Sequence, residues 1–289
     1  MNKRTAVVPL LLALAATACA PVDEGNTAED PAETPTAAEQ CATDSLPVLE
    51  PGTLTIGTDS PAYEPWFSGN DPTNGEGYES AVAYAVAEEL GFSADQVTWV
   101  KVPFNSSYKP GPKDFDFDIN QISITPQRAE VVDFSDGYYE AAQAVIALDD
   151  TPIAGATSVA DLADYNLGAQ TGTTSLTVIR DVIQPAGDPA VFEDTNAAKQ
   201  ALLNGQVDGI LADLPTAFYI TAVEIPKATL IGQFKPDTGE VEEFGMLFEK
   251  GSELVPCVNE ALATLKDDGT LDGIEQQWLS DVVDVPELQ

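Results

Sequence analysis

The sequence has no histidine, only three cysteines, and 12 lysine and arginine residues against 48 aspartate and glutamate residues. Without histidine the chain lacks the commonest general base, every serine–histidine pair and a usual ligand of zinc. We therefore expect no metal site and no cofactor. The formal net charge of −36 at pH 7 excludes nucleic acid as a partner, because its phosphates would be repelled.

Long apolar runs are also missing, apart from one near the N terminus. Residues 6–16 are apolar and follow Lys3 and Arg4, a pattern that predicts a secretory signal peptide over residues 1–18. The run is shorter than the about 20 residues that a membrane-spanning helix needs. It leads into Ala-Thr-Ala-Cys, which is similar to a lipoprotein cleavage box, so we expect Cys19 to carry a lipid anchor. Ala16 stands where leucine is usual, and a plain secreted protein is the alternative.

Basic and aromatic residues are absent from residues 20–44, which are rich in Pro, Ala, Thr and Glu. Such a segment cannot bury enough apolar surface to fold. We expect residues 19–45 to comprise the anchor and a disordered acidic tether.

If Cys19 is lipidated, Cys41 and Cys257 remain as an even pair in an oxidising compartment. A disulfide between them would tie the start of the folded part to its C-terminal helical region. Two unpaired thiols are the alternative.

About 245 residues follow the tether, and their strand-like and helix-like runs alternate, which predicts an α/β fold. Strands are predicted at residues 53–58, 97–102, 144–148, 167–170, 207–212, 229–234 and 244–248. Helices are predicted at residues 77–90, 173–183, 196–204, 214–221, 253–266 and 271–280.

Arg128 lies in a stretch with few other cations. The β-branched run Ile119–Ile124 before it predicts a buried strand and a turn. Thr125 and Pro126 then predict a helix start, with Thr as N-cap and Pro at the first helical position. A guanidinium beside a helix N terminus suits a carboxylate, which it can hold with two parallel bonds. A surface arginine paired with Glu130 or Asp133 is the alternative.

The segment Ser-Ile-Thr-Pro-Gln-Arg, followed by Val-Asp-Phe-Ser-Asp and Tyr-Tyr, resembles the extracellular solute-binding proteins of ABC importers for polar amino acids (bacterial solute-binding protein family 3). The resemblance covers residues 54–279. Gln127 stands where the family usually has Glu, and Gly137 stands where it usually has Pro. Neither change removes the arginine.

The resemblance implies a two-lobed periplasmic-binding-protein-like α/β fold with a central ligand cleft and two hinge crossings. Lobe one would comprise residues 46–139 and 243–289, and lobe two residues 144–236. The crossings would fall at residues 140–143 and 237–242. The sequence Pro-Asp-Thr-Gly at 236–239 independently predicts a turn or linker there.

By resemblance, the α-carboxylate of an amino acid would be held by Arg128 with help from Ser123, and by the Gly-Thr-Thr turn that contains Thr173 and Thr174. An ordinary N-cap is the alternative for that turn. The α-ammonium would be held by Asp213, which follows a predicted strand. Asp208 is the competing acid, which we interpret as structural.

The side-chain pocket would be lined by Asp59, Tyr63, Trp66 and Phe104. Core packing for the aromatic residues and a turn cap for Asp59 are the alternatives. Aromatic faces accept aliphatic, amide or cationic groups, while Asp59 and Glu64 favour a polar or cationic ligand.

These residues predict a lipid-anchored, monomeric receptor on the extracytoplasmic face of the cell membrane. It would capture a free amino acid and deliver it to the membrane permease of an ABC importer, and it would not be an enzyme. The alternatives are a ligand-sensing module and a dehydratase-like enzyme on the same fold.

Overall fold

The computed structural model describes residues 41–236, 241–279 and 285–289. All of them belong to one structural unit, residues 36–289. The predicted signal peptide, Cys19, the tether up to residue 40 and part of the second crossing lie outside the described residues. None of the helices in the described part has the length and apolar composition needed to cross a membrane.

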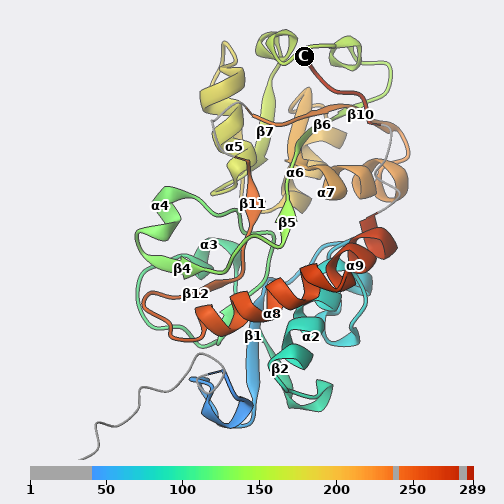
Figure 1. Ribbon diagram of the computed structural model, residues 1–289. Helices are drawn as coiled ribbons and strands as arrows, with labels where there is room; N and C mark the ends of the chain where they lie inside the picture. Colours follow the sequence, from blue (N-terminus) through green and yellow to red (C-terminus); the bar gives the residue numbers. More distant parts are fainter. Residues whose placement is uncertain (1–40, 237–240, 280–284) are drawn as a thin grey trace, which may run out of the picture. The chain divides into compact units, whose positions relative to one another are not determined.

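The first of two five-stranded sheets combines early and late parts of the chain (Figure 1). Its order is β2 (Val97–Lys101), β1 (Leu54–Thr58), β3 (Phe117–Asp118), β12 (Leu247–Glu249) and β4 (Val132–Phe134). β1 is parallel to β2 and β3, whereas β12 runs antiparallel between β3 and β4. The late strand β12 therefore completes a sheet that the first part of the chain begins.

Three long helices share one hydrophobic core with this sheet. They are α2 (Tyr78–Glu89), α8 (Val255–Asp267) and α9 (Thr270–Leu279). α2 begins after Gly77, whose φ of 94° favours glycine and whose added Cβ would clash with the backbone of Trp66 and Phe67. Glycine therefore allows the helix start to pack closely on the chain before it.

The second five-stranded sheet has the order β10 (Ala228–Phe234), β6 (Gln143–Leu148), β9 (Gly209–Asp213), β7 (Leu167–Gln170) and β8 (Ala190–Phe192). Along β6, Val145 and Ala147 belong to one buried cluster, and Ala144 and Ile146 belong to another. Because side chains alternate along a strand, the two clusters lie on opposite faces of this sheet. The helices that accompany it are α5 (Thr174–Val178), α6 (Thr195–Leu203) and α7 (Leu214–Tyr219).

The chain passes between the two sheets through a short two-stranded ribbon. β5 (Tyr139–Glu140), which precedes β6, pairs antiparallel with β11 (Glu243–Phe244), which follows β10. Figure 1 shows β5 and β11 between the two sets of elements. The outward and the return passage of the chain therefore run side by side.

The C-terminal residues depart from the predicted lobe assignment, which gave residues 243–289 to lobe one. Residues 285–289 lie along β10 of the second sheet, where Glu287 forms a bridge with Gln233. Leu288 is buried in a core cluster of that sheet. Its side chain packs against Gly232, where an added Cβ would come within 2.8 Å of it. The tail covers the edge strand β10, whose backbone groups would otherwise lack partners.

Shorter helices connect these elements, and some predicted strands and helices differ in detail. The strand predicted through Ile119–Ile124 does not form. β3 ends just before it at Asp118, Gln121 has a φ of 47°, and Ser123 makes only an isolated bridge with Phe244. The predicted helix at 173–183 continues from α5 into a π-helical turn. The short helices are α3 (Phe104–Ser107), α4 (Pro126–Ala129), η1 (Thr43–Ser45), η2 (Ser68–Asn70), η3 (Pro72–Asn74), η4 (Ala94–Gln96), η5 (Pro152–Gly155), η6 (Ala160–Asp164), η7 (Ile179–Ile183) and η8 (Ile220–Glu224).

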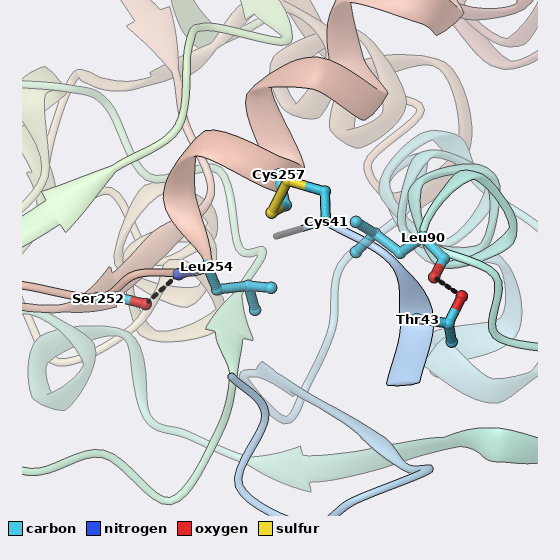
Figure 2. The surroundings of a disulfide bond; sticks show 6 residues. All are labelled: Cys41, Thr43, Leu90, Ser252, Leu254 and Cys257. Atoms are coloured by element: carbon cyan, nitrogen blue, oxygen red, sulfur yellow. Dashed lines mark hydrogen bonds between the residues drawn. A yellow bond between two sulfur atoms is a disulfide. The ribbon is translucent and has the colours of Figure 1, made fainter. Parts of the chain in front are cut away.

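Cys41 and Cys257 form a disulfide, as predicted (Figure 2). Cys257 lies in the first turn of α8, and its Cα is 5.3 Å from that of Cys41. Just after Cys41, the Thr43 hydroxyl donates a hydrogen bond of 3.0 Å to the Leu90 carbonyl at the end of α2. The disulfide and this bond attach the start of the described chain to two helices of the first core.

Candidate functional site

Arg128 is held inside the protein by the local structure that its sequence predicts. Thr125 caps α4, because its hydroxyl accepts a 3.2 Å hydrogen bond from the Arg128 N–H, and Pro126 takes the first helical position. Arg128 is only 8% exposed. Asp133 instead pairs with Lys250 at 2.7 Å. Arg128 is not in any ion pair found within the described residues. The alternative of a surface arginine paired with Glu130 or Asp133 is therefore wrong.

The Arg128 guanidinium connects the two sheets. Its Nη1 donates to the Ser123 carbonyl at 2.7 Å, and its Nη2 donates to the Gly172 carbonyl at 2.9 Å. The guanidinium carbon lies 5.5 Å from the ring centre of Phe104 and 4.9 Å from that of Tyr108. Burial lowers the pKa of Arg128, while Tyr108 and nearby carboxylates oppose the shift.

The Gly-Thr-Thr turn reaches the same region from the second sheet. Gly172 has φ 77°, and a Cβ there would clash with the side chains of Asn105 and Tyr108. Thr173 caps α5 by accepting a 3.2 Å bond from the Leu176 N–H. The Thr174 hydroxyl lies 3.3 Å from that of Ser123. The turn is therefore an N-cap, which was the alternative interpretation. It also contacts Ser123 across the cavity.

Asp213 ends β9 and is joined to a second carboxylate by one amide. Gln143 Nε2 donates to Asp213 Oδ1 at 3.0 Å and to Glu242 Oε2 at 3.1 Å. Ser123 Oγ donates to Glu242 Oε1 at 2.7 Å. Burial raises the pKa of Asp213 well above its ordinary value, and the Glu242 charge raises it further. These two neighbouring carboxylates therefore suit a bound cation.

Glu242 did not appear among the predicted site residues. Its position at the end of the predicted second crossing, residues 237–242, was the only sequence signal. Asp208, the competing acid, is exposed and accepts a 2.8 Å bond from the Asn166 N–H. It supports the turn before β7 and lies outside the cavity lining.

A cavity between the two sheets brings most of the predicted residues together. Its predicted lining residues are Asp59, Tyr63, Phe104, Ser123, Thr173, Thr174 and Asp213. Further lining residues are Asn120, Gln121, Gln170, Ser175, Thr195, Leu211, Ala212 and Thr216. Arg128, which was also predicted to bind the ligand, is not among the lining residues. It lies directly behind them and donates a hydrogen bond to the carbonyl of the lining residue Ser123.

Trp66 does not line the cavity, contrary to the prediction. It is fully buried in the first core, where its ring packs edge-on against Tyr78 and Tyr139. Its Nε1 donates a 2.7 Å hydrogen bond to the hydroxyl of Thr216, which does line the cavity. Trp66 therefore supports the wall from behind and links the first core to α7.

Asp59 was predicted to line the pocket, with a turn cap as the alternative, and it does both. Its carboxylate accepts bonds from the N–H groups of Ser60 at 2.6 Å and Phe104 at 3.0 Å, and it also lines the cavity. Among the described residues, the Tyr63 hydroxyl and the Asn120 amide nitrogen are buried without hydrogen-bond partners. Buried polar atoms are normally paired, so these two lining groups offer bonds that a polar ligand can complete.

Two α/β lobes, each built on one of the sheets and joined by two crossings, enclose a small polar cavity. This is the architecture of a solute-binding protein. The model of the bacterial extracellular solute-binding proteins, family 3, matches residues 54–281. The chain therefore belongs to this family, and the predicted resemblance and two-lobed fold are confirmed.

Similar proteins bind several amino acids. The L-cystine-binding protein TcyJ of Escherichia coli is 29% identical over 238 residues, which make up 80% of this chain and 84% of TcyJ. The arginine-binding extracellular protein ArtP of Bacillus subtilis is 28% identical over 234 residues, 78% of this chain and 86% of ArtP.

Solved structures show the same fold. An ancestral arginine-binding protein bound to arginine matches with a TM-score of 0.66 and 28% identity, over 79% of this chain and 98% of that one. The ancestral amino acid-binding protein AncCDT-1, a precursor of cyclohexadienyl dehydratase, matches with a TM-score of 0.63 and 28% identity, over 78% and 95% of the two chains.

Proposed function

We propose that this protein captures a free amino acid in the cavity between its two sheets and delivers it to the permease of an ABC importer. The proposal depends on one observation: opposite charges lie around one cavity. Asp213 lines the cavity and shares the Gln143 amide with Glu242, and the buried Arg128 lies directly behind the cavity wall. Free amino acids carry one anion and one cation on the same carbon. A site with both complementary charges, screened from water, recognises that pattern.

Arg128 would hold the α-carboxylate. A guanidinium has five N–H donors, and the two hydrogen bonds to the Ser123 and Gly172 carbonyls leave others for a ligand. The hydroxyls of Ser123 and Thr174 lie beside each other at the cavity wall. Together these groups suit an anion that enters between the sheets.

Asp213 would hold the α-ammonium. The pKa of Asp213 is raised because burial and the Glu242 charge, which disfavour ionisation, outweigh the Gln143 hydrogen bond and the Arg128 charge, which favour it. An ammonium bound there would reverse this effect. Binding should therefore release protons at a pH below the raised pKa, and it should strengthen as the pH rises through it.

A lipid anchor at Cys19 would keep the receptor at the extracytoplasmic face of the membrane, with the acidic segment as a tether and a monomer as the working unit. The Ala-Thr-Ala-Cys sequence supports this proposal. Cys19→Ala should release the protein into the medium. Membrane retention of that variant would place the anchor elsewhere.

A thermal-shift screen of the twenty amino acids, L-cystine and small amines tests ligand capture. A ligand present at 100 times its Kd stabilises the native state by about 2.7 kcal/mol. For a chain of this size, about 2–4 °C per kcal/mol predicts a rise in Tm of about 5–11 °C. If no amino acid raises the Tm, the proposed function is wrong.

A further inference from the structure

A second cavity adjoins the ligand cavity. Tyr63, Thr195 and Thr216 line both of them. The other walls of the second cavity include Glu64 from the segment after β1, and Lys199 and Glu224 from α6 and η8. The two cavities therefore have a common wall, and a ligand that occupies both would pass between these side chains.

The second cavity holds a buried cation. Lys199 is only 7% exposed, in a protein whose charged residues are mostly acidic. Its ammonium donates to both Glu224 oxygens, at 2.8 and 2.7 Å, and lies 5.8 Å from the ring centre of Tyr63. Lysine is almost never fully buried without a partner, and a buried ion pair contributes little net stability. Stability alone therefore does not explain why a lysine is buried in this cavity wall, and ligand binding can explain it.

The ion pair selects the kind of group that fits. An ammonium has three N–H donors, and after the two bonds to Glu224 one is left for an anion. Glu224, 34% exposed in its side chain, and Glu64 can accept from a cation beside it. A lone guanidinium or ammonium would instead face the Lys199 charge. The complementary group is a second zwitterion.

We propose that Lys199 and Glu224 bind the distal end of an amino acid that carries an α-amino-acid group at both ends, such as a disulfide- or thioether-linked bis-amino acid. This inference rests on the proposed function, because the near end would be held by Arg128 and Asp213. It narrows the polar or cationic preference that Asp59 and Glu64 indicated in the sequence to a ligand with two zwitterionic ends.

Calorimetry with defined ligands tests the second compartment. The probes are L-cystine and L-cystathionine, which have two zwitterionic ends, and S-methyl-L-cysteine and L-arginine, which have one. We expect the wild-type protein to bind the two-ended ligands at least about tenfold more tightly, a difference of about 1.4 kcal/mol. Lys199→Met should weaken the two-ended ligands at least about tenfold more than S-methyl-L-cysteine.

The matched control is Lys227→Met, which removes the same charge from an exposed position in the second lobe and should leave all affinities unchanged. Unfolding of each variant is followed separately, because Lys199→Met also breaks an ion pair between α6 and η8. Lys199→Gln, which keeps a hydrogen-bond donor, should restore part of the preference.

The outcomes separate the two proposals. If arginine or S-methyl-L-cysteine binds as tightly as the two-ended ligands, or if Lys199→Met weakens all ligands equally, the ion pair is a structural brace and this inference is wrong while ligand capture stands. If no amino acid binds the wild-type protein, ligand capture and this inference both fail.

Discussion

Arg128 carries both structural and proposed ligand-binding contacts. Its guanidinium bonds to the Ser123 and Gly172 carbonyls, so Arg128→Ala should lower the free energy of unfolding by about 1.5–3 kcal/mol. Its loss should also leave a ligand carboxylate buried and unpaired, at about 2–5 kcal/mol. We expect binding to weaken by about 30- to several thousand-fold.

Calorimetry and urea unfolding on the same preparation check this prediction. Arg128→Lys should also bind weakly, because a point charge cannot replace a planar fork. If folded Arg128→Ala binds within about threefold of wild type, well under 1 kcal/mol, Arg128 has no role in the site.

Glu79 is a buried acid that makes stability depend on pH. It accepts bonds from the Gln121 backbone and side chain and from the Tyr138 hydroxyl. Burial raises its pKa to about 7. Because the folded-state pKa is raised, the native state binds the proton more tightly than the unfolded chain. The stability from protonated Glu79 is therefore full below about pH 4.5, falls as the pH rises to about 7, and is constant above.

The predicted loss of stability between about pH 4.5 and 7 is about 3 kcal/mol. Glu79→Gln cannot ionise, so its Tm should change less across this range than that of wild type. Glu88→Gln, an exposed position on the same helix α2, is the control and should run parallel to wild type. Parallel curves for Glu79→Gln and wild type would contradict the assignment.

Residue roles were predictable where a local motif set them. Thr125, Pro126 and Gly172 follow capping and turn rules that act within a few residues, and Arg128 lies where those rules place it. Trp66 was wrongly predicted to line the cavity, and Glu242 was not predicted to lie near it, for the same reason. Whether a side chain faces the core or the cavity depends on α7 and on the second crossing, which are distant in sequence.

At the scale of elements, long periodic segments were predictable and short ones were not. β1, β7 and α2 lie within one residue of their predicted bounds at each end. β4, β5 and β8 have only two or three residues, too few for a pattern to emerge. The C-terminal tail was assigned to the wrong lobe because its partner, the edge of β10, is defined only by the folded second sheet.

The Cys41–Cys257 disulfide fastens the start of the fold to α8, across a sequence separation of 216 residues. Closing so long a loop restricts the unfolded chain, so Cys41→Ser together with Cys257→Ser should lower the free energy of unfolding by about 2–5 kcal/mol. Urea unfolding with and without a reductant measures this loss. Cys19→Ser is the control and should leave the midpoint unchanged. Equal midpoints for the double variant and wild type would show that the bridge does not constrain the unfolded chain.

At the scale of the whole molecule, hydrogen bonds between polar groups join the two lobes in the absence of a ligand. The polar contacts across the cavity include Arg128 with Gly172, Ser123 with Thr174, and Trp66 with Thr216. Such bonds contribute about 0.5–1.5 kcal/mol each, somewhat more where one partner is charged. The ribbon of β5 and β11 is the two-part connection around which the lobes can rotate. We therefore expect the free protein to populate an open form.

A bound amino acid should shift this equilibrium, because only the closed form can place Arg128 and Asp213 around it. Small-angle scattering should show a smaller radius of gyration at saturating ligand than in its absence. Trp66→Phe keeps an aromatic ring in the core but removes the bond to Thr216. This variant should increase the radius of gyration of the free protein and weaken binding in proportion to the lost closed population, while the saturated form should match wild type. A scattering profile that does not change with ligand in either protein would mean that the cavity is preformed and the lobes do not move.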